Sequence, residues 1–106
     1  MKTLVILTRR ADGKAEDFKR LAKPEVLHVW QGFAQGVVRA VHGLAAGPGA
    51  AFELESATFE EAREYIEALP YVKEDLLHVQ YCALKPFSDY ERLGGELDQL
   101  PTQHIP

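Results

Sequence analysis

A short turn in the middle of the chain, AAGPG at residues 45–49, constrains the fold more than any other feature. The segment before it, residues 37–44 (VVRAVHGL), predicts a strand, and residues 51–55 alternate apolar Phe52 and Leu54 with two glutamates. Strict alternation is typical of a half-buried strand, and two strands joined by a short turn of this composition form a hairpin. We therefore expect an antiparallel β-hairpin at the centre of the chain.

A strand and a helix are predicted on each side of this hairpin. Residues 3–8 (TLVILT) predict a strand buried on both faces, and a helical segment follows it. After the hairpin, Thr58 and Glu61 have the spacing of a capping box that opens a short helix, and Pro70 ends this helix. Residues 76–84 (LLHVQYCAL) predict the last strand. The order β-α-β-β-α-β predicts an α+β domain with a four-stranded antiparallel sheet and two helices on one face.

The first helix carries a proline near its middle. Phe18 and Leu21 share one face, but Pro24 removes a backbone donor and disfavours helix at the preceding residue, so we expect a break or kink there and an immediate restart. Gly36 predicts the C-terminal stop of the restarted helix. The second part continues an apolar stripe that we interpret first as core side chains: Val26, Val29, Trp30, Phe33 and Val37.

The 106 residues suit one domain, with a core of about residues 2–87 and a C-terminal extension at residues 88–106. Both helices lie on one face of the predicted sheet, which leaves the other face open, and three of the four strands are apolar in both phases. An open apolar face calls for a partner, and the simplest closed solution pairs two copies face to face. We therefore predict a homodimer, or a higher oligomer of such dimers.

Charge and composition argue against several classes of protein. The net charge of −4 and the lack of a basic run argue against a nucleic-acid partner. The apolar stretch at residues 4–7 is too short for a signal peptide or a membrane span, and the single Cys82 forms no internal disulfide, so we expect a cytoplasmic protein without a membrane partner. The histidines lack metal-ligand spacing and no phosphate-binding glycine motif occurs, so we predict neither a metal nor a cofactor.

Two residues on the restarted helix form a candidate acid–base pair. Glu25 and His28 are three residues apart and can share one helix face, where a carboxylate beside an imidazole can move a proton near neutral pH. The alternative is an ordinary side-chain pair on a solvated face. Arg39 could bind a substrate carboxylate, or it could pair with a glutamate across the hairpin. His42 lies on the opposite face of the same strand unless a bulge intervenes.

The last strand and two aromatic residues supply the remaining candidates. His78, Gln80 and Cys82 share one phase, and this polar row could line a cavity or form a wet edge. Trp30 and Tyr81 could wall an apolar pocket. The complete site prediction is Glu25 and His28 as catalytic residues, with Arg39, His42, His78, Trp30 and Tyr81 in substrate binding.

Several segments resemble a known superfamily. The carriers are KTLVILT, QGVVRAVHGLAAGPGAAFELES, TFEEAREYIEALPYV and HVQYCALKPFSDYERL. Together they resemble the muconolactone isomerase-like proteins of the dimeric α+β barrel superfamily, and the segments LPYV and KPE also resemble the related YCII-like proteins. The resemblance covers residues 2–93. It implies a ferredoxin-like fold that pairs through its sheet, and by position Glu25 and Arg39 fall near a Glu and an Arg of the isomerase. The charged residues at the end of the isomerase's last strand are not reproduced.

Three functions are compatible with these observations. The resemblance implies a cofactor-independent enzyme that transfers a proton on a small acidic or aromatic-derived metabolite, as muconolactone isomerase does. A cofactor-free monooxygenase of the same superfamily, with Trp30 and Tyr81 around a flat substrate, is an alternative. A non-catalytic protein that binds a small ligand or only dimerises is another, because a fold shared by many chemistries does not by itself carry a function. The sequence leaves open whether the protein is an enzyme.

Overall fold

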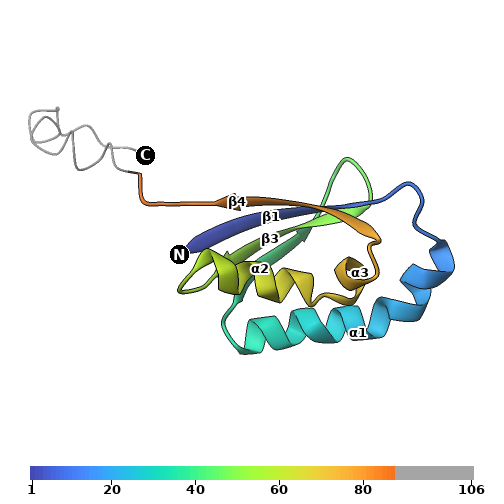
Figure 1. The fold of residues 1–106 in the computed structure, drawn as a ribbon, viewed down its shortest axis with the longest axis horizontal. Helices are drawn as coiled ribbons and strands as arrows, with labels where there is room; N and C mark the ends of the chain where they lie inside the picture. The colour runs from blue at the N-terminus through green and yellow to red at the C-terminus, as the bar shows by residue number, and fades with distance from the viewer. Residues whose placement is uncertain (88–106) are drawn as a thin grey trace, which may run out of the picture.

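The computed structural model describes residues 1–87, which form a four-stranded antiparallel sheet with every helix on the same face (Figure 1). The strands lie in the order β2-β3-β1-β4, so the first strand is central. This confirms the predicted ferredoxin-like α+β fold. The predicted extension at residues 88–106 lies outside the described part. The elements in chain order are β1 (Lys2–Arg9), α1 (Ala15–Ala34), β2 (Val38–Gly43), β3 (Gly49–Glu55), α2 (Phe59–Glu67), α3 (Pro70–Lys73) and β4 (Leu77–Ala83).

The core lies between the sheet and the helices. On the central strand, Val5 pairs with Phe52 of β3 and with Tyr81 of β4, so these side chains point to the helix face. Full burial of one aliphatic side chain stabilises a fold by about 1.5–3 kcal/mol. The core cluster consists of Val5, Leu7, Val38, Phe52, Leu54, Ala62, Ile66 and Leu69.

The predicted capping box opens α2. The Thr58 hydroxyl oxygen accepts the backbone N–H of Glu61 at 3.2 Å, and the Glu61 carboxylate accepts the N–H of Ala57 at 3.1 Å. Pro70 does more than follow this helix, because it is the first residue of α3, which sequence analysis missed. Proline suits that position, since its fixed φ is helical and its missing N–H has no partner to lose there.

Of the break or kink expected at Pro24, the break is wrong, because α1 runs without interruption for 20 residues with the proline inside it. Packing holds the turns on both sides: Phe18 meets the Tyr71 ring edge-on with centroids 5.0 Å apart, and His28 stacks on Tyr65 at 4.6 Å. These contacts offset the missing hydrogen bond. The stop at Gly36 is confirmed. Its φ is +81°, and its N–H donates to the Phe33 carbonyl at 3.1 Å.

A β-bulge in β2 changes which side chains face the helices. Val38 pairs with Leu54, but the next pair joins Ala40 to Glu53, so Arg39 is the additional residue. As a result Val41 faces the helices together with Val38, although the two are an odd number of residues apart. Arg39 and His42 were expected on opposite faces of the strand unless a bulge intervened. The bulge at Arg39 means that this simple alternation does not apply.

The interpretation of the α1 stripe as core is wrong for most of its members. Val26 is 68% exposed, Trp30 67% and Phe33 40%, whereas Val29 packs against the core. A helix turns about 100° per residue, so apolar residues spaced three or four apart spread around the helix. In α1 some of them face the core and others face outward. We call Val26, Trp30 and Phe33 the α1 outer stripe.

Candidate functional site

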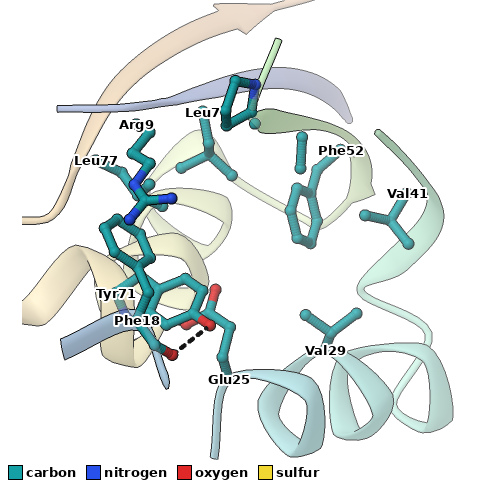
Figure 2. Close-up of a pocket in the computed structure, with 12 residues that line it drawn as sticks. Leu7, Arg9, Phe18, Glu25, Val29, Val41, Phe52, Tyr71 and Leu77 are labelled. Atoms are coloured by element: carbon teal, nitrogen blue, oxygen red, sulfur yellow. Dashed lines mark hydrogen bonds between the residues drawn. The ribbon is translucent and has the colours of Figure 1, made fainter. Parts of the chain in front are cut away.

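A cavity of about 290 Å³ lies between α1 and the sheet, beside the hairpin turn (Figure 2). Aliphatic and aromatic side chains form most of its wall, and Glu25 and Arg9 are the charged residues that line it. Figure 2 shows Arg9, Phe18 and Tyr71 at one end and Phe52 and Val41 at the other. The remaining lining residues are Leu7, Val29, Pro48, Gly49, Ala50 and Leu77.

Glu25 projects into the cavity from the middle of α1. Its Oε1 accepts the backbone N–H of Tyr71 at 2.9 Å, at the start of α3. Within residues 1–87 no hydrogen bond reaches its Oε2, which is therefore available to a ligand. Burial raises the pKa of the Glu25 carboxyl, and the Tyr71 N–H partly opposes this effect. A carboxyl of this kind is a stronger base than an exposed one.

Arg9 reaches the cavity from the last position of β1. Its guanidinium lies over the Phe18 ring, with Cζ 3.9 Å from the ring centroid, which is a cation–π geometry. No ion pair among the described residues joins Arg9 to Glu25, although both line the same cavity. A cation and an acidic group thus face one small space without neutralising each other directly.

Tyr71 connects these groups to the backbone. Its hydroxyl donates to the Phe18 carbonyl at 3.0 Å, so the ring is fixed across the space between α1 and α3. Burial raises the pKa of the Tyr71 phenol, and the nearby Glu25 carboxylate raises it further. The phenol therefore stays neutral near neutral pH, and its hydrogen bond holds the ring in place at the side of the cavity.

His28 lies outside the cavity, in the contact between α1 and α2. Its Nε2 is 3.0 Å from the Tyr65 carbonyl oxygen, and the Tyr65 hydroxyl donates to the His28 carbonyl at 3.0 Å. Burial raises the pKa of Tyr65 to about 12. The structure does not bring His28 and Glu25 to one face, because these reciprocal contacts turn the imidazole toward α2.

The polar candidates on the strands also lie away from the cavity. Arg39 donates from Nε to the Gly36 carbonyl at 2.8 Å, which ties the bulge to the end of α1. His42 lies 3.4 Å from a Glu53 carboxylate oxygen on the open face of the sheet. His78 is exposed on the same face, since it pairs with Thr8 and alternates with the half-buried Leu77.

The two aromatic candidates occupy other regions. Tyr81 meets Phe59 edge-on with ring centroids 5.5 Å apart, near the start of α2, and Trp30 belongs to the α1 outer stripe. Sequence analysis missed Arg9, Phe18 and Tyr71 as cavity residues. One signal could have found Arg9, because it continues the alternation of Thr3, Val5 and Leu7 on the buried face of the first strand.

Two searches of the described part of the chain add to this description. Within residues 1–87, no group of three or more His, Cys, Asp or Glu side chains is placed to hold a metal ion. The same residues include no helix with the length and apolar composition needed to span a bilayer.

Comparison with solved structures finds a neighbour of known fold. It is 5-chloro-2-hydroxyhydroquinone dehydrochlorinase of Burkholderia phenoliruptrix AC1100, in complex with 2,5-dihydroxybenzoquinone. The TM-score is 0.64 at 16% sequence identity, over 80% of this chain and 94% of the neighbour. The two chains share a fold. It is the ferredoxin-like arrangement of a four-stranded antiparallel sheet with the helices on one face. No protein-family model matches the sequence, and no curated protein matches it.

Proposed function

We propose that the protein is a cofactor-independent enzyme that moves a proton on a small, single-ring acidic or aromatic-derived metabolite bound in the cavity. The observation that carries this proposal is the unpaired placement of Glu25 and Arg9 around one small apolar space. Burial makes the charge of Glu25 costly, and the exposed Arg9 lies at the same space, so the retention of the carboxylate favours a ligand that contacts both groups.

The chemistry follows from the two groups. Ionised Glu25 takes a proton through Oε2 from a substrate carbon next to a carbonyl, and negative charge develops on that carbonyl oxygen. Arg9 stabilises this oxygen by charge-assisted hydrogen bonds. The Glu25 carboxyl then returns the proton to another carbon of the same conjugated system, which shifts a double bond without any other reactant. This is the reaction type that the likeness to muconolactone isomerase-like proteins implies.

The size of the cavity supports a one-ring substrate. Its volume of about 290 Å³ is at the lower limit of the roughly 300–1,000 Å³ typical of ligand sites. The molecule bound to the structural neighbour, 2,5-dihydroxybenzoquinone, is also a single ring carrying oxygen atoms. A flat polycyclic substrate, as the monooxygenase alternative requires, has no support here, because Trp30 and Tyr81 do not line the cavity.

The test is a proton-exchange assay in deuterated water with a panel of unsaturated lactone acids and hydroxyquinones. Exchange is followed by NMR for the wild type, Glu25→Gln and Arg9→Gln. Glu25→Gln should slow exchange at least about 100-fold, the usual contribution of a general base. Arg9→Gln should also weaken substrate binding. Glu64→Gln, which neutralises an exposed carboxylate on α2, is the matched control and should exchange at the wild-type rate.

Two results would contradict the proposal. One is a wild-type exchange rate in Glu25→Gln, and the other is a panel in which no compound binds or exchanges. His28→Gln distinguishes the role of His28 from that of Glu25, the two residues that the sequence predicted as an acid–base pair. Because His28 faces Tyr65 rather than the cavity, we expect its turnover to stay within a few-fold of wild type.

The sheet face opposite the helices is open, and this supports the pairing of two copies of the chain. Leu4, Ile6 and Ala51 lie on it, and Figure 1 shows no helix over that side. Ile6 is 36% exposed at the centre of this face. We propose a homodimer through the two sheets. Ile6→Glu should then halve the mass in sedimentation equilibrium, whereas an unchanged mass would exclude this face as the interface.

A further inference from the structure

The cavity has a charged end and an apolar end. Arg9 and Glu25 lie toward one end, whereas Val29, Val41 and Phe52 form the other (Figure 2). These last three side chains come from α1, β2 and β3 and carry no polar atom. A ligand that fills the space therefore meets charge on one side and hydrocarbon on the other, so the two ends select different parts of the ligand.

Val41 is the most exposed side chain at the apolar end. It pairs with Phe52 and shares its face of the sheet, toward the helices, yet 37% of Val41 is exposed. Val38, on the same face of the same strand, is only 2% exposed, because the close approach of α1 at Gly32 covers it. Since Val41 lies beyond that cover and lines the cavity, its exposed surface is available to a bound molecule.

The β-bulge at Arg39 decides which residue of β2 reaches the cavity. Without the extra residue, Ala40 and His42 would face the helices, and an imidazole would stand at this end of the cavity. The bulge reverses the alternation, so Val41 takes that place and His42 turns to the open face of the sheet. The Arg39 Nε donates to the Gly36 carbonyl at 2.8 Å, which holds the bulge in position. The backbone of β2 is thus shaped to keep this end apolar.

We propose that the substrate carries an apolar substituent, the size of a methyl group, on the side of its ring opposite the reacting oxygen, and that Val41 determines this specificity. The oxygen lies at Arg9, the exchanging carbon at Glu25 and the substituent against Val41. Covering apolar surface is favourable, whereas a hydroxyl or charged group at this end would lose its hydrogen bonds to water. The inference rests on the proposed function, because it names the substrate class of the same site.

Three hydroxyquinones that differ at one ring position test the proposal. They are hydroxybenzoquinone and its two derivatives with a methyl or a second hydroxyl group para to the first hydroxyl, the last being 2,5-dihydroxybenzoquinone. Titration calorimetry measures their binding, and the NMR exchange assay measures turnover. We expect the methyl compound to bind the wild type at least about tenfold more tightly than the dihydroxy compound, since an apolar pocket discriminates between such groups by this factor. It should also bind more tightly than the unsubstituted compound.

Two substitutions of Val41 should change this preference in different ways. Val41→Thr keeps the branched shape of the side chain and places a hydroxyl at the apolar end, so the preference for methyl over hydroxyl should fall about tenfold. Val41→Ala enlarges this end, so the preference should move from the methyl compound to its ethyl analogue. Val26→Ala is the matched control, because Val26 is 68% exposed on the α1 outer stripe and does not line the cavity. It should keep the wild-type preference.

The outcomes separate this inference from the proposed function. Equal binding of the methyl and dihydroxy compounds, or a preference that Val41→Thr leaves unchanged, would overturn the specificity, while exchange that depends on Glu25 would still support proton transfer. A preference that depends on Val41, without exchange of any compound, would support the specificity and contradict the proposed reaction. Absence of binding for all three compounds would overturn both.

Discussion

The two halves of the helix layer differ in how they meet the sheet. Under α2 the packing is solid: Ala62, Ile66 and Leu69 are fully buried against the sheet. Under α1 the same sheet faces a cavity, and the helix contributes the partly buried Glu25 to it. The comparison indicates a division of roles. The α2 half stabilises the fold by close packing, and the α1 half provides a cavity and a charged group that suit a ligand.

The difference arises from how closely each part of α1 approaches its neighbours. At Gly32 the approach is tight, since a Cβ there would lie 2.6 Å from the Val38 side chain and in conflict with the Tyr65 hydroxyl. Two turns earlier, Glu25 faces the cavity, and the Phe18–Tyr71 ring pair forms the wall at that end. The close approach is therefore found at the C-terminal end of α1, and the cavity lies beside its middle.

The largest contrast should come from truncating one side chain in each half. Ile66→Ala removes a fully buried side chain from the solid half and should lower the free energy of unfolding by about 2–5 kcal/mol. Val29→Ala should cost about 1 kcal/mol or less, because the cavity already leaves that side chain incompletely packed. Urea denaturation measures both values, and equal losses would contradict the division into solid and hollow halves.

Filling the tight approach should have the next largest effect. Gly32→Ala adds a methyl group where Val38 and Tyr65 leave no room, so we expect a loss of about 1–3 kcal/mol from overpacking. Thermal and urea unfolding of the variant test this. Gly47→Ala is the control, since a Cβ there meets nothing within 4 Å. A neutral Gly32→Ala would mean that α1 can move outward without penalty.

One substitution should strengthen the solid half. Thr3 is fully buried on β1, and its hydroxyl oxygen has no hydrogen-bond partner. Thr3→Val keeps the shape and removes the unsatisfied group, so the free energy of unfolding should rise by about 1 kcal/mol. Chemical denaturation detects a gain of this size. A loss of stability would indicate that the hydroxyl has a partner in solution.

The smallest effect concerns pH and belongs to the hollow half. Burial raises the pKa of Glu25, so the folded protein keeps this proton at a higher pH than the unfolded chain does. Its favourable contribution is complete below the ordinary carboxyl pKa and is lost as pH rises through the raised value. The stability of wild type relative to Glu25→Gln should therefore decline across that window. A relative stability that stays constant or increases there would refute the assignment.

Sequence patterns predicted the architecture well because it depends on local chemistry. The AAGPG turn, the alternation of Phe52 with Leu54 and the Thr58 cap each specify one element, and together they give the strand and helix order. Pro24 does not end the helix as its local chemistry predicts, since tertiary contacts of Phe18 and His28 hold the helix through it. Periodicity also could not decide which of two stripes on α1 faces inward, so Trp30 was placed in the core.

The candidate site was only partly predictable, because it depends on long-range geometry. Glu25 was identified from its residue type and helical position, and the structure does place it in the cavity. His28 was grouped with it by spacing, but Tyr65 on another helix sets its direction. Arg39 could not be oriented without knowledge of the bulge, and Arg9 resembled an ordinary charged strand end. A cavity is formed by elements far apart in the chain, which no local pattern records.

The central position of β1 has a consequence for how the protein is made. This strand is synthesised before its neighbours β3 and β4, and the pairing of Thr3 with Ala83 spans almost the whole described chain. Contacts so distant in sequence slow folding, because a long loop must close before they form. During synthesis this apolar strand therefore stays unpaired until β3 emerges, and its second edge stays open until β4 follows. For that interval the nascent chain exposes an aggregation-prone segment, and chaperone binding to β1 would protect it.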